Sequence, residues 1–568
     1  MAGPPNALVA VLVRLRQTLV DHDLPYDTAD SGPARTERNQ LIQQLDDYVI
    51  PRLVQIEAPL LTVVGGSTGA GKSTLVNTLV GHPVTRTGVL RPTTRSPVLV
   101  HHPDDAHWFG TDRLLPDLER TERPAGDQRT LQLVATTALP PGLAILDAPD
   151  VDSVEEQNRR LAAQLLAAAD LWLFVTSAAR YADQVPWDFL KTAAERSTAV
   201  AIVLDRTTPK AVREVSSHLA RMLTARGLGD SPLFTVPEAP VDADGLLPAS
   251  SVAAIRAWLD SLAADSDARS AVVRRTLDGA IGSLGHRTRT VVQAFRTQEK
   301  VAEQLRADVE SAYASTLTAV TAATGDGSML RGEVLARWQE FVGTGELLKS
   351  LEARVGRLRD RVLKGRGAQP VDKVQVAVES GLETLIVEHA ESAAERAALA
   401  WRGLPAGAAL LQTAPPDIGR ASRGFPERVQ RAVRDWQGTV VHLVRSQGTA
   451  RRSTARFLAF GVNGISVALM IVIFVHTAGL TGAEVGVAGG SAVVAQKILE
   501  AIFGDQAVRR LAEAARVDLE RRVAALWDDE KRRFLDVVDA QAVPEGLSFD
   551  LGTLSREVDD TRRAEPPG

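Results

Sequence analysis

The chain has 568 residues, which suggests about three or four domains at the usual ~100 to 200 residues each. Apolar residues make up 45% and charged residues 24% of the chain, which is typical of folded protein and excludes a disordered or collagen-like chain. The net charge of −5 gives no reason to expect a nucleic-acid partner. The absence of cysteine excludes disulfides, thiolate metal sites and thiol catalysis.

Residues 1–58 are expected to form helices ahead of the first strand. Leucines recur at helical spacing over Leu8–Leu19, and apolar residues do so again over Leu41–Val49. The opening stretch Met1–Pro5 lacks the charged region with which a signal peptide begins. We therefore predict two amphipathic helices in this segment, with a new domain beginning at Pro59.

A phosphate-binding loop follows the first predicted strand. Leu60–Val64 has the pattern of a buried strand, the next ten residues read GGSTGAGKST, and Leu75–Val80 continues as an apolar helix face. This is the motif G-x-x-x-x-G-K-S between the strand and the helix that it requires, and a glycine-rich turn that matches by accident would not explain both flanks. The glycines let backbone N–H groups turn toward phosphate oxygens, and the helix N-terminus adds its dipole. The residues predicted to bind the nucleotide here are Gly66, Ser67, Thr68, Gly69, Ala70, Gly71, Lys72, Ser73 and Thr74.

The region after the loop alternates predicted strands with predicted helices. Strands are expected at Leu171–Val175, Val200–Leu204 and Leu233–Val236, and the last helical stretch ends near Leu262. This alternation of strands and helices predicts a parallel sheet with helices on both faces, an α/β fold. Over Pro59–Ala264 the segments STGAGKSTLVNTLVG, RPTTRSP and DAPDVDS resemble a TRAFAC-class GTPase domain of the Era-like or dynamin-like kind. We therefore predict a P-loop GTPase domain over residues 59–264.

The resemblance implies roles for individual residues. Lys72 would reach the β- and γ-phosphates, and the Ser73 hydroxyl would bind Mg²⁺. The strand Gly142–Leu146 ends in Asp147, which would hold Mg²⁺ through water. Arg91–Pro97 lies at the position of the first switch, where a threonine completes the Mg²⁺ shell and senses the γ-phosphate. The predicted catalytic residues are Lys72, Thr93 and Thr94, and the predicted metal-binding residues are Ser73, Asp147 and Thr94.

Two positions depart from the family pattern. Asp150 replaces the glycine of D-x-x-G, which adds a negative charge near the γ-phosphate and reduces conformational freedom. The guanine-reading N-K-x-D is expected after Val200–Leu204, where the chain reads DRTT. Asp205 either substitutes for the missing carboxylate or caps its strand, and both interpretations stay open. GTP is thus implied by the resemblance, with Asp205 and Arg206 as the candidate base-binding residues.

Residues 265–456 are predicted to form a long all-α region. Apolar residues repeat at helical spacing from Val272, from Leu335 and from Leu351. Breaks that contain glycine occur at 325–327, 365–370 and 407–417. Residues 505–568 are predicted to form one further helix, over Val508–Leu526, and a disordered tail from Arg562.

An apolar stretch at 457–504 suggests a membrane hairpin. Phe457–Ala483 contains no Lys, Arg, Asp or Glu, and its first 19 residues would form a helix about 28 Å long, close to the hydrocarbon thickness of a bilayer. A buried core helix is the alternative, although such helices rarely lack charge on every side. Val485–Phe503 is poorer in apolar residues, and would either span as a second helix packed on the first or re-enter.

Basic residues on both flanks indicate the orientation of this hairpin. Arg451 and Arg452 precede it, Arg509 and Arg510 follow it, and the turn 476–484 has neither Lys nor Arg. Because basic flanks favour the cytoplasmic side, we expect a multi-pass protein of the cell membrane with both termini in the cytoplasm.

The layout as a whole resembles that of bacterial dynamin-like proteins. In that family the N- and C-terminal helices pack into a shared stalk and the hairpin forms a membrane-facing tip. The resemblance implies a membrane-anchored GTPase that couples GTP binding and hydrolysis to stalk rearrangement and membrane remodelling. Its expected partners are the lipid bilayer and either a second copy or a paired paralogue, through the nucleotide domain. The alternative is a nucleotide-gated, membrane-bound binding or scaffold protein with little or no hydrolysis and without strict specificity for guanine, which Asp150 and the altered base motif favour.

Overall fold

Strand β1 (Leu60–Gly66) lies inside an eight-stranded sheet whose strand order is β3-β4-β2-β5-β1-β6-β7-β8 in the computed structural model. It pairs in parallel with β5 (Leu143–Asp147) on one side and with β6 (Leu171–Ser177) on the other. Strand β2 (Val98–His101) runs antiparallel to β5, whereas the other recorded strand pairs are parallel. The loop after β1 therefore emerges at the sheet edge where β5 and β6 also end.

The structure describes residues 7–86, 96–111, 113–124, 129–153, 155–195, 198–208, 210–325, 337, 370–448, 454–475, 495–496, 499–500, 502–541 and 543–564. Within them, the strands expected near residues 60, 143, 171, 200 and 233 are present as β1, β5, β6, β7 (Ala199–Thr207) and β8 (Leu233–Pro237). Strands β2, β3 (Glu119–Thr121) and β4 (Thr130–Ala135) were not predicted. The predicted α/β domain with a long helical region is confirmed.

Helices cover both faces of the sheet, as the alternation of β1 side chains requires. Leu60 and Val64 point to a core shared with α4 (Lys72–Val80) and α8 (Ala249–Ala264). Leu61 and Val63 point to the opposite core. That second core is shared with α5 (Glu156–Ala167), α6 (Gln184–Glu195) and α7 (Val212–Thr224), and η2 (Pro103–Phe109) is a 3₁₀ helix at its margin.

The described chain divides into two compact units. The first consists of Met1–Leu24, Ala29–Glu299 and Pro544–Gly568, and the second of Pro25–Thr28 and Lys300–Val543. Helix α9 (Ser266–Gly325) contributes residues to both. The first unit thus contains the sheet together with helices from both ends of the chain.

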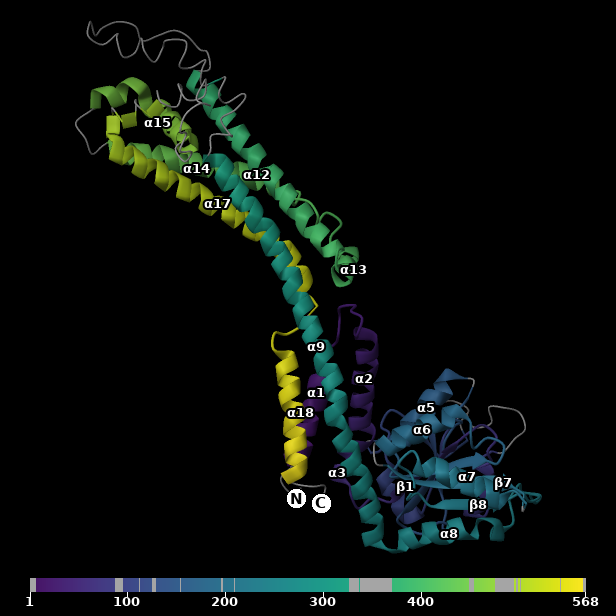
Figure 1. Cartoon of the computed structure of the whole chain (residues 1–568). Helices are drawn as coiled ribbons and strands as arrows, with labels where there is room; N and C mark the ends of the chain where they lie inside the picture. Colours follow the sequence, from purple (N-terminus) through teal and green to yellow (C-terminus); the bar gives the residue numbers. More distant parts are fainter. Residues whose placement is uncertain are drawn as a thin grey trace, which may run out of the picture. The chain divides into compact units, whose positions relative to one another are not determined.

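Helices from the two chain ends pack together in the first unit. α1 (Ala7–Asp21) lies beside α18 (Leu547–Ala564), and both adjoin the first part of α9 (Figure 1). Arg14 of α1 forms an ion pair with Glu557 of α18. Arg287 of α9 pairs with Glu37 of α2 (Ser31–Gln44). The chain termini are therefore joined by packing and charge to the helix that leaves the sheet domain.

The next helices connect this bundle to the sheet through a buried ion pair. A π-helical segment, η1 (Leu45–Val49), runs into α3 (Ile50–Val54), which carries Arg52. Arg52 and Asp170 are both 1% exposed and their charged groups lie 2.8 Å apart. Asp170 also accepts a hydrogen bond from the backbone N–H of Leu61 at 2.8 Å. This pair fixes the helices to the beginning of β1.

The second unit is helical, and hydrogen bonds from tryptophan indoles link its helices to one another. Its helices are the later part of α9, α12 (Pro370–Arg402), α13 (Pro405–Thr413), α14 (Phe425–Gly448), α15 (Thr454–Val475) and α17 (Asp505–Asp539). Three buried tryptophans each donate to a neighbouring helix: Trp401 to the Leu305 carbonyl at 3.0 Å, Trp436 to the Ala515 carbonyl at 2.8 Å and Trp527 to the Thr316 hydroxyl at 3.0 Å. These bonds fix the axial register of helices whose apolar faces alone would allow sliding. The predicted repeats from Leu335 and Leu351 lie outside the described residues.

Helix α15 lies in a protein core where the sequence predicted the first arm of a membrane hairpin. It contains the uncharged stretch Phe457–Val475, and residues 465–474 are all buried in the core of the helical unit. Helices α12, α14 and α17 contact it, and the Trp436 and Phe474 rings lie 5.8 Å apart. Among the helices of the described ranges, none combines the length and the apolar character needed to cross a membrane. The lack of charge over residues 465–474 fits their burial against these helices. Most of the second predicted segment, Val485–Phe503, lies outside the described residues.

The C-terminus also differs from the prediction of a single helix and a disordered tail. α17 extends beyond the predicted Val508–Leu526, and α18 follows it as far as Ala564. Arg562, assigned to the tail, lies in α18 and donates to the Asp278 carboxylate at 3.0 Å. Packing against α9 explains this order, which the short polar sequence does not indicate.

Removing the charge of Asp170 should destabilise the first unit strongly. Asp170→Asn leaves the Arg52 guanidinium buried without a counter-ion, which typically costs about 3–5 kcal/mol. The midpoint of thermal unfolding should therefore fall. Asp260→Asn is the control, because Asp260 pairs with Arg256 on the surface and is 42% exposed. Equal midpoints for the two variants would contradict the role given to the buried pair.

A second buried acid makes stability depend on pH. Burial raises the pKa of Asp47 to about 7, with Asp117 and Asp46 adding to the rise and the Gln164 hydrogen bond and Arg120 opposing it. Because the folded state then holds a proton that the unfolded state has lost, stability falls as the pH rises toward and through about 7. Asp47→Asn keeps the acceptor for Gln164 and removes the titration. Its melting temperature should exceed that of the wild type increasingly from pH ~5 to ~8, by ~2–4 °C per kcal/mol recovered. A pH-independent difference would contradict this.

Candidate nucleotide site

The loop between β1 and α4 depends on two glycines. Gly66 has a φ of +146°, and a Cβ there would lie 1.9 Å from the Val175 carbonyl oxygen of β6. Gly71 has a φ of +92°, and a Cβ there would lie 2.2 Å from the Asp205 carboxylate. A side chain at Gly66 would collide with the backbone of β6, and one at Gly71 would meet the Asp205 carboxylate in a backbone conformation that other residues rarely adopt. The sheet therefore accepts only glycine where the loop begins and where it turns into α4.

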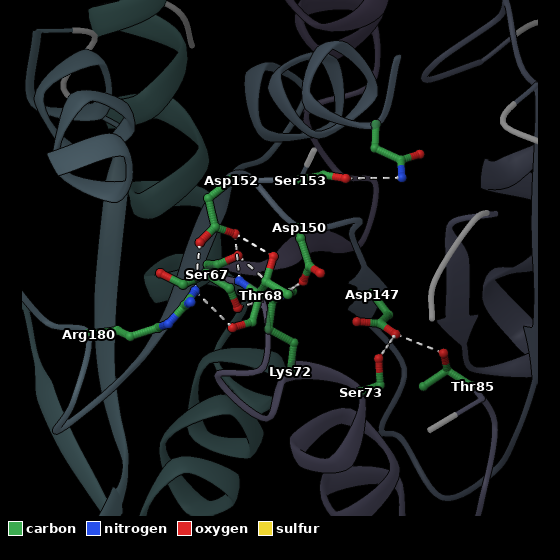
Figure 2. A network of polar contacts seen from close by, with 12 residues as sticks. Ser67, Thr68, Lys72, Ser73, Thr85, Asp147, Asp150, Asp152, Ser153 and Arg180 are labelled. Atoms are coloured by element: carbon green, nitrogen blue, oxygen red, sulfur yellow. Dashed lines mark hydrogen bonds and ion pairs between the residues drawn. The ribbon is translucent and has the colours of Figure 1, made fainter. Parts of the chain in front are cut away.

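Lys72 lies over the loop with all its donors engaged. Its side chain is 5% exposed, and the ammonium donates to the Gly66 and Ser67 carbonyls at 3.1 Å each. The third partner is the Asp150 carboxylate, with which it forms an ion pair (Figure 2). The cation is thus positioned by the loop itself and neutralised by the residue that replaces the family glycine.

Asp147 lies at the end of β5 and forms a separate group with two hydroxyls (Figure 2). The side chain is fully buried, and its Oδ2 accepts from Ser73 Oγ and from Thr85 Oγ1 at 2.7 Å each. Its Oδ1 is also buried and has no hydrogen-bond partner among the described residues. Burial raises the pKa of Asp147, while the hydrogen bonds from Ser73 and Thr85 act in the opposite direction.

The group around Asp147 fits a magnesium ion. Carboxylate and hydroxyl oxygens are the hard ligands that Mg²⁺ prefers, and the free Oδ1 lone pairs require a cation or a donor. A divalent cation would also stabilise the ionised carboxylate against its burial. Thr85 was not predicted, because it precedes the switch sequence and belongs to no motif. The predicted Thr93 and Thr94 lie outside the described residues.

A third group closes the outer side of the loop. Asp152 accepts from the backbone N–H and the hydroxyl of Thr68, at 2.6 Å each. Arg180, which follows β6, donates to the Asp152 carboxylate at 2.9 Å and to the Thr68 carbonyl at 3.2 Å (Figure 2). Neither residue was predicted from the sequence motifs. Asp152 follows Asp147 closely in the sequence, but Arg180 reaches the loop only because β6 is adjacent to β1.

The candidate base-binding residues lie at the end of β7. Asp205 is 6% exposed, accepts the backbone N–H of Arg206 at 2.8 Å and has a pKa raised by burial. Its carboxylate lies beside Gly71, so it packs against the foot of the phosphate loop. Arg206 has a φ of +53°, which few residues adopt. These contacts suit the strand-capping interpretation, and the base-reading role of Asp205 and Arg206 stays a prediction.

Comparison with protein families identifies the sheet domain. Residues 62–206 match the family described as 50S ribosome-binding GTPase. This range contains the phosphate loop, Asp147 and Asp205. The chain thus contains a P-loop GTPase domain, as predicted. No curated protein matches the chain significantly.

Solved structures similar to the chain come from bacterial dynamins. Two belong to work on an oligomerised bacterial dynamin pair and the long-range sensing and tethering of membranes. The first is 9% identical with a TM-score of 0.43, covering 99% of this chain and 96% of that one. The second is 11% identical with a TM-score of 0.29, covering 77% and 80%. LeoA, a bacterial dynamin GTPase from ETEC, is 12% identical with a TM-score of 0.23, covering 98% and 97%.

Lys72→Ala should weaken nucleotide binding. The substitution removes the buried ammonium and leaves the Asp150 carboxylate unpaired near the phosphates. Affinity should fall at least ~tenfold, about 1.4 kcal/mol, because charge-assisted bonds to phosphate are strong. Calorimetric titration with GTP would measure this, with the exposed Lys191 replaced by alanine as the control. Unchanged affinity in Lys72→Ala would exclude the loop from the site.

Ser73→Ala should separate metal-dependent from metal-independent binding. The variant loses the hydroxyl that lies on Asp147 and that would also serve as a Mg²⁺ ligand. We expect weaker GTP binding in Mg²⁺ and nearly unchanged binding in EDTA. Titration in both buffers provides the measurement. A variant that keeps the full Mg²⁺ effect would place the ion elsewhere.

Proposed function

We propose that the protein is a dynamin-like GTPase that couples GTP binding and hydrolysis to rearrangement of its helical region and to remodelling of a membrane. The proposal rests on helix α9, which belongs partly to each unit. Helices from both termini pack beside α9, and α9 continues without interruption from the unit that holds the GTPase domain into the helical unit. A change in the sheet domain that moves residues 266–299 would therefore act on residues 300–325 of the same helix.

The chemistry assigned to the site needs no covalent participation by the protein. Phosphoryl transfer relies on positioning and on neutralising the developing charge. Lys72 would provide the cation for the β- and γ-phosphates, and Ser73 and Asp147 would hold Mg²⁺ with Thr94 from the first switch. Bound there, Mg²⁺ would neutralise phosphate charge. Thr93 and Thr94 would sense the γ-phosphate, and Asp205 and Arg206 would face the base.

The membrane part of the proposal places the bilayer contact at α15 and its basic flanks. Arg509 and Arg510 lie in the second turn of α17, and Arg509 is 65% exposed. Anionic lipid attracts basic side chains at such positions. Insertion of a hairpin over 457–504 would require α15 to leave α12, α14 and α17, because residues 465–474 are buried there. We therefore propose peripheral binding first, with insertion only after such an opening.

The proposed partner is a second copy of the chain, or a paralogue, that meets it through the nucleotide domain. GTP binding would then promote the pairing, because it orders the switch segments. Sedimentation in GDP and in a slowly hydrolysed GTP analogue tests this. A mass that is equal in both nucleotides would contradict nucleotide-dependent pairing.

A second candidate function is a nucleotide-gated binding or scaffold protein with little hydrolysis. The contact between Asp150 and Lys72 favours it, because the cation needed in the transition state carries a competing partner. In this case GTP would control binding without rapid turnover.

One assay distinguishes the two candidates. Phosphate release by the full-length protein is measured with GTP and with ATP, with and without vesicles that contain anionic lipid. The GTPase proposal expects turnover of GTP that vesicles increase and that Lys72→Ala abolishes. Nucleotide binding without turnover in any condition would leave the gated binding protein. Preference for ATP would contradict guanine recognition.

A further inference from the structure

All three N–H groups of Lys72 have a partner, and only one of these partners is a side chain that can move away from the loop. A lysine ammonium has three N–H groups. Two of them go to the Gly66 and Ser67 carbonyls, which belong to the phosphate loop itself, and the third goes to Asp150. A phosphate oxygen therefore gains a bond from Lys72 only by replacing the Asp150 carboxylate.

At Thr68, too, a carboxylate accepts hydrogen bonds that the loop would otherwise give to phosphate. The backbone N–H groups of such a loop bind phosphate oxygens. Here the Thr68 N–H and hydroxyl both donate to Asp152, whose other oxygen accepts from Arg180. Asp150 and Asp152, the acidic pair, are each 16% exposed at the side chain and lie two residues apart on one short segment. Both carboxylates thus occupy donors that the motif uses for phosphate.

We propose that the acidic pair is a built-in competitor of the nucleotide phosphates and that Asp150 determines how well the site distinguishes a triphosphate from a diphosphate. The inference rests on the proposed nucleotide site. A γ-phosphate needs the Lys72 donor and meets the charge of Asp150 directly, whereas a diphosphate makes fewer demands on both. Triphosphate binding therefore requires Asp150 to move away.

Movement of the acidic pair would first reach helix α5. Ser153 follows the pair, and its carbonyl accepts from Arg159 of α5 at 2.6 Å. Its hydroxyl accepts from the Asn158 amide at 3.4 Å. Further along α5, Gln164 donates to Asp47 in the helices before the sheet at 2.9 Å. Displacement of Asp150 by phosphate would thus pull on a helix that contacts the N-terminal helices.

The test compares affinities of full-length variants for a slowly hydrolysed GTP analogue and for GDP, in Mg²⁺. Asp150→Asn removes the charge with little change in shape. It should raise triphosphate affinity by roughly tenfold, since an ion pair with Lys72 becomes a weaker bond from the ammonium to a neutral amide oxygen, and diphosphate affinity by less. Asp152→Asn should raise affinity for both nucleotides. Circular dichroism checks the folding of each variant, and Asp152→Asn keeps the proposal testable if Asp150→Asn proves to be misfolded. Asp260→Asn, a surface control paired with Arg256, should change neither affinity.

A double variant separates competition from simple repulsion. If Asp150 acts by occupying Lys72, the gain from Asp150→Asn should be clearly smaller in a Lys72→Ala background, where only the relief of repulsion remains. A gain that is undiminished there would overturn the proposal in favour of repulsion alone. Unchanged affinity of the well-folded Asp150→Asn and Asp152→Asn proteins, with normal wild-type binding, would overturn it and leave the GTPase proposal intact. Absence of nucleotide binding by wild type and all variants would overturn both.

Arg180→Ala tests whether the ion pair with Arg180 holds Asp152 on the loop. Arg180 contacts Asp152 and the Thr68 carbonyl and has no recorded contact with Lys72. Its removal should raise affinity, by less than Asp150→Asn does. A fall in affinity would assign Arg180 to the nucleotide and contradict its role in holding Asp152.

Discussion

The position of the phosphate loop depends on the buried ion pair between Arg52 and Asp170. Asp170 accepts the N–H of Leu61 at 2.8 Å and returns its own N–H to the Leu61 carbonyl at 3.0 Å, which aligns β6 with β1 where both begin. Arg52 also donates to the Gln55 and Ala58 carbonyls at 3.2 Å each, so α3 and the turn after it are held by the same side chain. Burying two charges costs more than a neutral contact would, so we infer that the pair contributes register rather than net stability. A shift of β1 by one residue that brought Ser67 to the place where Gly66 now lies would set a Cβ against the Val175 carbonyl.

The sequence predicted the parts of the site that belong to one continuous segment. The loop from Gly66 to Thr74 lies on a strand, a turn and a helix in that order, and Asp147 ends its strand, because local patterns determine such units. Residues that arrive from other elements were missed. Arg180 reaches Thr68 only because β6 is hydrogen-bonded to β1, and Thr85 reaches Asp147 from the loop after α4. Strand order and loop paths are long-range properties, and no motif in a single sequence encodes them.

Helix α15 illustrates a different limit of sequence patterns. A run without charge satisfies the requirement for a membrane span and the requirement for a helix enclosed by other helices equally well. The surroundings of α15 in the structure are those of a core helix: α12, α14 and α17 contact it, residues 465–474 are buried, and the Trp436 and Phe474 rings lie 5.8 Å apart. The apolar content of those three helices is interspersed with charge, so the sequence does not reveal that they enclose a fourth. Any bilayer contact made by α15 must compete with this packing.

The contact between Lys72 and Asp150 connects the two candidate functions. Under the proposal, triphosphate binding would break this contact, so part of the binding free energy would be used to move the segment that carries Asp150 and, through Ser153, helix α5. Loss of the γ-phosphate would free the Lys72 donor again, and Asp150 is placed to accept it. Reformation of the pair would then return α5 to its first position and favour release of the diphosphate. Fast hydrolysis would make this a repeating cycle that can drive mechanical work on the helical unit. Slow hydrolysis would leave the same two positions as a switch that reports nucleotide occupancy. The geometry around Lys72 is common to both functions, and the rate of phosphate loss alone determines which of them the protein performs.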